Sequence, residues 1–234
     1  MKRLSDHVQT GSIKELRKKL DSLIKKPLQI KSWIEDNVPR SDKSIAFTNF
    51  LSAISDSAAL AKQSANKNIS LLALATRNQY EINVRIRSII EDSKELEKWL
   101  SELITDQIQI YEGVKELNAD ADMAFARKSL EVEISRLRKI AIKHSLPEVK
   151  SPESTGRLAS KLGLGAEHKS LFKLFSKLIH PTSYLLNNPE DASSSNNFMI
   201  LQIHTQLYAI DSIGRICTEF NVPHEVSKPF GCPK

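Results

Sequence analysis

Apolar side chains recur every three or four residues along most of the chain, which is the spacing of one face of an α-helix. Segments with this pattern cover residues 13–26, 28–36, 42–62, 68–92, 94–113, 119–144, 158–165, 167–180 and 198–220. Only 7 glycines occur in 234 residues, which is few for a protein with many strands and hairpin turns. The pattern predicts an all-α fold, a helical bundle.

Capping residues and prolines set the expected helix boundaries near the N-terminus. Ser12 with Glu15 three residues later forms a capping-box sequence at the start of the first helix. We expect that helix to stop before Pro27, because proline lacks the N–H of an interior helical residue. The first 65 residues are less strongly apolar than those that follow, and we interpret them as an N-terminal basic helical extension, either an accessory arm or the outer layer of the main bundle.

The net charge of +6 is unevenly distributed. Residues 1–43 hold 11 Lys and Arg against 6 Asp and Glu, and residues 134–180 hold 10 against 3. The intervening residues 91–133 hold 5 Lys and Arg against 12 Asp and Glu. Basic blocks of this size favour an anionic partner, although lysines and arginines also simply solvate outward faces. One functional alternative is a DNA-binding accessory protein that uses residues 1–43.

Other sequence signals narrow the class of protein. No apolar run reaches the roughly 18 residues that cross a bilayer, so we expect no membrane partner. The two cysteines form no pattern of metal-ligand spacing, and we predict neither a metal site nor a cofactor. We expect a cytoplasmic protein, because these cysteines also fit a reducing compartment.

The segment around His180 is the first candidate for chemistry. Proline at position 181 disfavours helical geometry in the preceding residue, so the helix should end at about His180. Lys173, Ser176, Lys177 and His180 share one helical face. An imidazole beside two ammonium groups suits phosphate chemistry, with the lysines holding the anion and the histidine moving a proton. The alternative is a solvated face that ends in a C-capping histidine.

A second constellation lies on the helix predicted over residues 68–92. Arg77, Glu81 and Arg85 are spaced four residues apart, with Asn78 alongside. On an exposed helix this spacing forms an ordinary ladder of ion pairs. The helix is apolar over most of its circumference, so these charges are expected to be partly buried and are also a candidate functional cluster. We predict that Arg77 and His180 converge on one cationic hollow.

Two segments, LLALATRNQYEINVRIRSI and GRLASKLGLGAEHKSLFKLFSKLIHPTSYLL, resemble uncharacterised bacterial helical proteins placed near the HEPN superfamily (higher eukaryotes and prokaryotes nucleotide-binding domain). The matching features are Arg77 with Glu81, the run Leu158–Leu164, and Phe175–Pro181 with its closing His-Pro. The resemblance covers residues 66–220 and leaves residues 221–234 as a C-terminal tail. It implies a HEPN-like bundle that is commonly dimeric.

Many HEPN proteins are metal-independent RNA endonucleases of toxin and antiviral defence systems, with an arginine shortly before the catalytic histidine. Here the window before His180 holds Lys173 and no arginine, so Arg77 would supply the guanidinium from the neighbouring helix. The resemblance thus implies RNA as a partner, a homodimer, and a site with catalytic His180, Arg77 and Lys173 and RNA-binding Lys177, Asn78, Glu81, Ser176 and Arg85. The alternative is a catalytically inactive helical module that binds a partner protein or a nucleotide.

Overall fold

The computed structural model describes residues 8–10, 12–117, 124–147 and 149–228. These residues form helices, turns and loops, and none of them forms a strand. The all-α fold predicted from the hydrophobic periodicity is therefore confirmed. Residues 119–123, where the periodicity placed the start of a helix, lie outside the described residues.

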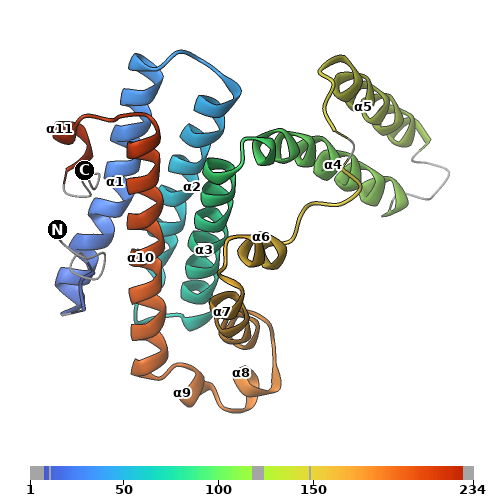
Figure 1. Ribbon diagram of the computed structural model, residues 1–234. Coiled ribbons are helices and arrows are strands. Elements are labelled where there is room, and N and C mark those ends of the chain that lie inside the picture. Colours follow the sequence, from blue (N-terminus) through green and yellow to red (C-terminus); the bar gives the residue numbers. More distant parts are fainter. Residues whose placement is uncertain (1–7, 11, 118–123, 148, 229–234) are drawn as a thin grey trace. The chain divides into compact units, whose positions relative to one another are not determined.

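The chain divides into two compact units (Figure 1). Unit 1 combines residues 1–90 with residues 155–234, and unit 2 consists of residues 91–154. The helices of unit 1 are α1 (Ile13–Asn37), α2 (Asp42–Ser64), α3 (Ile69–Glu91), α6 (Thr155–Lys161), α7 (Gly165–Ile179), α8 (Ser183–Asn187), α9 (Pro189–Ala192), α10 (Ser195–Glu219) and α11 (His224–Ser227). Those of unit 2 are α4 (Lys94–Leu117) and α5 (Ala124–Lys143).

Helix α1 begins as the capping residues predict. The Ser12 hydroxyl accepts a hydrogen bond from the Glu15 backbone N–H, and the Glu15 carboxylate accepts one from the Ser12 backbone N–H. These two bonds satisfy backbone donors that have no partner inside the helix. The capping box is confirmed.

The predicted break at Pro27 is wrong, because α1 continues without interruption to Asn37 and includes the separate short helix expected over residues 28–36. An interior proline removes one backbone hydrogen bond and costs about 3 kcal/mol. Pro27 is buried on the same face as five apolar side chains, Leu16, Leu20, Leu23, Ile30 and Ile34. Packing of this face against α2 outweighs the local cost.

Helices α1 and α2, which lie within the first 65 residues, pack inside unit 1. Helix α1 contacts α2, α10 and α11, and α2 contacts α10. The rings of Phe47 on α2 and Phe220 at the end of α10 meet edge to face, with centroids 5.5 Å apart. These contacts place α1 and α2 in the same compact unit as α10.

Helix α3 is joined to its neighbours by buried polar contacts as well as apolar ones. The Thr76 and Thr205 hydroxyls of α3 and α10 lie 2.7 Å apart. The Gln79 amide donates to the carbonyl of Ile54 on α2 at 2.8 Å. Each contact satisfies a group that would be costly to bury alone, so α3 has a defined rotation within unit 1.

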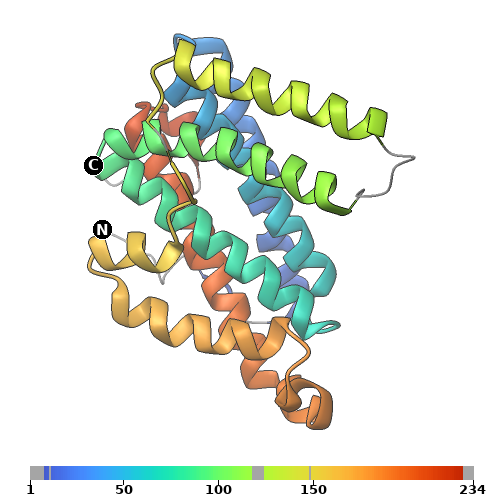
Figure 2. The same cartoon turned by 90° about the vertical axis from the view of Figure 1, so that its right-hand side faces the viewer.

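Helix α7 lies against α3 in unit 1, and these two helices carry the residues of the predicted site (Figure 2). Leu171, Phe175 and Leu178 of α7 are buried, and the Phe175 ring lies 6.4 Å from the ring of Tyr80 on α3. The opposite side of α7 faces solvent. This amphipathic division decides which α7 side chains can meet α3.

Unit 2 is a hairpin of α4 and α5. Its two helices are linked by ion pairs between Lys115 and Glu131 at 3.6 Å and between Arg138 and Glu112 at 3.4 Å. The segment after α5 returns to α4, where the Thr105 hydroxyl donates to the carbonyl of Val149 at 2.6 Å.

Candidate functional site

The ion pair predicted on α3 is present. Arg77 Nε donates to Glu81 Oε1 at 2.8 Å, and the two side chains are about one-third exposed. The guanidinium carbon of Arg77 also lies 5.1 Å from the centre of the Phe172 ring on α7, within the range of a cation–π interaction. Arg77 is therefore held by one contact within its own helix and one across the α3–α7 interface.

The other predicted α3 residues have different surroundings. Asn78 is half-buried beside Arg77. Arg85 is only 8% exposed, in contrast to the accessible Arg77–Glu81 pair. The predicted ladder thus has an exposed half at Arg77 and Glu81, and only that half can reach a ligand from solvent.

The histidine that joins this cluster is His168, which the sequence interpretation did not single out. Its Nδ1 lies 3.2 Å from the Tyr80 hydroxyl, and its ring centre lies 4.0 Å from that of Phe172. Burial lowers the pKa of His168, and the nearby carboxylate of Glu81 offsets part of that shift. The spacing of His168, Phe172 and Phe175 by four and three residues was the available signal.

His168 is enclosed on its second side as well. A Cβ atom added to Gly156 of α6 would lie 2.9 Å from His168 Nε2, which is too close for an unstrained contact. The imidazole therefore lies between the Tyr80 hydroxyl and the backbone of Gly156. This arrangement holds the ring between α3 and α6 and limits the approach of a ligand to either nitrogen.

Two tyrosines extend the cluster towards α10. The ring of Tyr208 on α10 lies 5.1 Å from that of Tyr80, and the Tyr208 hydroxyl donates to Glu167 Oε1. Burial raises the pKa of both phenols, and the charge of Glu167 raises both further. Both hydroxyls therefore stay protonated across the physiological pH range, and that of Tyr208 is used as the donor to Glu167.

His180 lies elsewhere on α7. It is the C-cap residue, with φ −86° and ψ 154°, so the helix ends where Pro181 predicted. Eight residues of helix separate it from Phe172, which corresponds to about 12 Å along the axis. The contacts of Arg77 are with Glu81 and Phe172, and the imidazole beside them belongs to His168.

His180 instead ends an exposed row of polar side chains on α7. We call this row the α7 cationic face, and it consists of Lys169, Lys173, Ser176, Lys177 and His180. Within the described part of the chain, the three lysines have no acidic partner. Several other lysines and arginines of unit 1 do pair with a carboxylate, for example Lys43 with Glu219. Lys169 was not singled out from the sequence, although it precedes Lys173 by one helical turn.

The backbone at the end of α7 is satisfied locally. The Thr182 hydroxyl donates to the carbonyl of Lys177 at 2.9 Å, and the Thr182 N–H donates to the carbonyl of His180 at 2.7 Å. These bonds fix the turn after the helix without the imidazole. The His180 side chain is exposed and free to meet a ligand.

A separate polar network links α3 to α10. Asp211 accepts hydrogen bonds from Asn83 at 2.8 Å, from Arg215 at 2.7 Å and from Arg87 at 3.0 Å. Burial alone would raise the pKa of Asp211, but the bonds from Arg215 and Asn83 and the charge of Arg87 outweigh it and lower the pKa. This is a structural link between two helices, because one carboxylate is shared by two guanidinium groups and an amide.

Comparison of the chain with protein-family models, with curated proteins and with solved structures finds no match in any of the three. Among the described residues, no group of three His, Cys, Asp or Glu side chains is placed to hold a metal ion. None of their helices has both the length and the apolar character needed to span a bilayer. Evidence on function therefore comes from the geometry of each of the two units.

Proposed function

We propose that the protein binds RNA through the α7 cationic face. The observation that carries this proposal is that Lys169, Lys173 and Lys177 are exposed, lie on one side of one helix and have no acidic partner in the described part of the chain. Uncompensated cations in a row attract a polyanion, and each phosphate contact releases condensed counterions. The part of unit 1 that leads into this face, residues 155–180, holds 5 Lys and Arg against 1 Glu and extends the same field.

RNA is the favoured polyanion because a guanidinium, that of Arg77, is held against α7 in the same part of unit 1 as these lysines. Phe172 is half-buried between Arg77 and His168, and Lys173 follows it directly in α7. Single-stranded RNA is bound by proteins that combine phosphate-binding cations with aromatic or arginine surfaces for its unstacked bases. The Arg77–Glu81 pair holds the guanidinium plane in place for such a contact.

The proposal includes a chemical step at His180. An exposed imidazole next to Lys177 could accept the proton of a ribose 2′-OH while its oxygen bonds to the adjacent phosphorus, which gives a 2′,3′-cyclic phosphate and breaks the bond to the 5′-oxygen. The imidazolium then returns that proton to the departing 5′-oxygen, which leaves as a hydroxyl group. The ammonium groups of Lys173 and Lys177 would stabilise the charge on the phosphate oxygens. This is the metal-independent cleavage implied by the HEPN resemblance. A role in a toxin or antiviral defence system rests on that resemblance alone.

The binding step is tested by fluorescence anisotropy with a labelled single-stranded RNA at several salt concentrations. Replacement of Lys169, Lys173 and Lys177 by Gln should weaken binding and flatten the salt dependence by about 2 in log–log slope, since each single-strand phosphate contact contributes about 0.7. The matched control replaces Lys14, Lys18 and Lys25, which are exposed on α1 and free of acidic partners in the described structure. Loss of binding in the control alone would contradict the proposal.

The chemical step is tested by incubating the protein with RNA in EDTA. Cleavage by the wild type and by His168→Gln, together with its loss in His180→Gln, is the expected result. Binding without cleavage in all three proteins would remove the chemical step and leave an RNA-binding module.

A second candidate function is a protein-interaction module that assembles as a homodimer through unit 2. Three large apolar residues of α4 are exposed in one stripe, Leu103, Ile110 and Leu117. Their spacing of seven residues is that of one position of a coiled-coil heptad repeat.

The opposite charges of α4 and α5 favour a second copy of the chain as the partner at this stripe. Helix α4 holds 3 Lys and Arg against 6 Asp and Glu, whereas α5 holds 6 against 2. Two hairpins related by a twofold axis can place each acidic α4 beside a basic α5. Light scattering after size-exclusion chromatography should show a dimer that Ile110→Lys dissociates and Ile142→Lys, at an exposed position off the stripe, does not. A monomeric wild type would exclude this candidate.

A further inference from the structure

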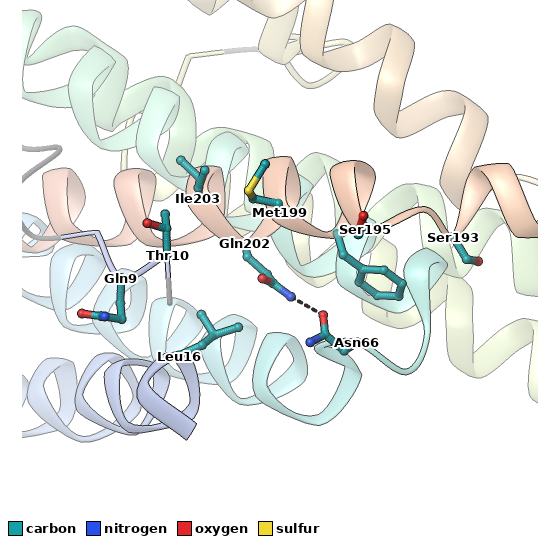
Figure 3. Close-up of a pocket in the computed structure, with 10 residues that line it drawn as sticks. Gln9, Thr10, Leu16, Asn66, Ser193, Ser195, Met199, Gln202 and Ile203 are labelled. Atoms are coloured by element: carbon teal, nitrogen blue, oxygen red, sulfur yellow. Dashed lines mark hydrogen bonds between the residues drawn. The ribbon is translucent and has the colours of Figure 1, made fainter. Parts of the chain in front are cut away.

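A pocket of about 410 Å³ lies at the start of α10, next to the turn between α2 and α3 and the residues that precede α1 (Figure 3). This volume is within the range of small-molecule binding sites. None of the residues that line the pocket is charged. It shares no lining residue with the α7 cationic face or with the His168 cluster.

One wall of the pocket is held in place by reciprocal hydrogen bonds. The backbone N–H of Gln9 donates to Gln206 Oε1 at 2.8 Å, and Gln206 Nε2 donates to the carbonyl of Gln9 at 3.1 Å. Gln206 is fully buried in α10. The segment before α1 is therefore fixed to α10, and the pocket is formed before any ligand arrives.

The polar centre of the pocket is a pair of amides. Gln202 Nε2 donates to Asn66 Oδ1 at 2.8 Å, as Figure 3 shows. In the described structure, Gln202 Oε1 and Asn66 Nδ2 make no other hydrogen bond. The pair therefore offers one free acceptor and one free donor to a ligand in the pocket. If the oxygen and nitrogen of both amides were exchanged, one acceptor and one donor would still remain free.

The turn residue Asn66 is held in an unusual backbone conformation that aims its side chain at Gln202. Its φ of 56° lies in the left-handed region, which asparagine adopts more readily than most residues. The Asn66 amide thus comes from a tight turn and the Gln202 amide from a helix. The hydrogen bond between the two amides sets the separation of the remaining donor and acceptor.

The apolar side of the pocket suits a flat ligand. Phe198 supplies an aromatic ring, and Met199, which is 47% exposed, supplies a polarisable thioether. Aromatic rings stack on nucleobases, and methionine sulfur makes favourable contacts with aromatic systems. A phosphate, in contrast, would find no cation among the lining residues.

We propose that this pocket binds an uncharged nucleobase, with the free acceptor and donor of Gln202 and Asn66 meeting an edge of the base. Adenine is the base expected to bind most tightly, because its N6 donor and N7 acceptor are the groups that amide side chains recognise. The base can belong to a free nucleoside or to a single strand. This site does not depend on the proposed role of the α7 cationic face.

The test is calorimetric titration of the full chain with adenosine, guanosine, cytidine and uridine. Adenosine should bind. The affinity for AMP should be the same at about 50 mM and about 200 mM salt, because the pocket offers no phosphate contact. Gln202→Met and Asn66→Gly should each weaken adenosine binding by about two- to tenfold, the effect of losing one hydrogen bond. Glycine is chosen at position 66 because it tolerates positive φ.

The control variant is Asn196→Ala, which removes an exposed amide from the same end of α10 and should leave the affinity unchanged. Thermal melts of each variant show that the fold is retained. Absence of nucleoside binding at about millimolar concentration, or equal affinity in the wild type and Gln202→Met, would overturn the proposal.

An adenine-containing oligonucleotide that displaces adenosine would assign the pocket to a base of a strand. One that does not displace it would assign the pocket to a free nucleoside, and both results support a base pocket. Replacing the three lysines of the α7 cationic face should not change adenosine affinity. Failure of RNA binding at α7 and failure of this pocket are therefore distinguishable.

Discussion

The imidazole of His168 lies between the Tyr80 hydroxyl, 3.2 Å from its Nδ1, and the backbone of Gly156 next to its Nε2. This contact joins α6 and α7 to α3 through one side chain. Because burial lowers the pKa of His168, the folded protein favours the neutral ring.

The stability of the protein should therefore fall on acidification through the histidine range. The unfolded chain binds a proton at its ordinary pKa of about 6.5 and folded His168 binds it at lower pH, so stability present above pH 6.5 is lost as the pH falls below it. Urea unfolding at about pH 7.5 and 5.5 should show a smaller difference in His168→Phe than in the wild type. The exposed His180→Phe should keep the wild-type difference; an equal reduction in both variants would contradict this assignment.

Alanine at position 156 should destabilise the protein. The new methyl group would lie 2.9 Å from His168 Nε2, and overpacking of this kind costs about 1–3 kcal/mol. Gly214→Ala is the control, because no atom lies within 4 Å of its added Cβ and helix propensity favours alanine there by about 1 kcal/mol. Chemical denaturation measures both. Adding His168→Ala to Gly156→Ala should recover part of the loss, whereas a strictly additive double variant would show that the two residues do not meet.

Substitution of Asp211 by Asn should destabilise unit 1 by about 1–3 kcal/mol. The change leaves the partly buried Arg87 and Arg215 without their carboxylate, and unpaired buried groups carry a desolvation penalty of this size. The wild-type pKa is lowered, so this stabilisation is present above the ordinary Asp pKa and is lost as the pH falls through the folded value. Asp36→Asn, at an exposed position of α1, should change the free energy of unfolding by less than about 0.5 kcal/mol.

Replacement of Pro27 by Ala should stabilise the protein slightly. Alanine is about 3 kcal/mol more favourable than proline inside a helix, whereas removing two buried CH₂ groups costs about 1.6 kcal/mol. The difference predicts a gain of about 1 kcal/mol in the free energy of unfolding, measurable in urea. A loss of stability would mean that the proline ring contributes more to the core than its size suggests.

Part of the candidate site could be predicted because it depends on neighbours in sequence. Arg77 and Glu81 are one turn apart and pair as expected, and the end of α7 at His180 follows from Pro181. The partner of Arg77 on α7 could not be predicted in this way. Phe172 and His168 meet α3 only because the buried face of α7 sets the rotation of that helix.

By itself, the sequence determined the helical class, the capping of α1 and the clustering of lysines on one side of α7, because each depends on residues within four positions of one another. Only the tertiary structure decided that α1 passes through Pro27, that Asn83 meets Asp211 and that Tyr80 meets His168 across 88 residues. Those outcomes follow from which helical faces pack together. Packing sums many weak contacts from distant segments, and no local pattern contains that sum.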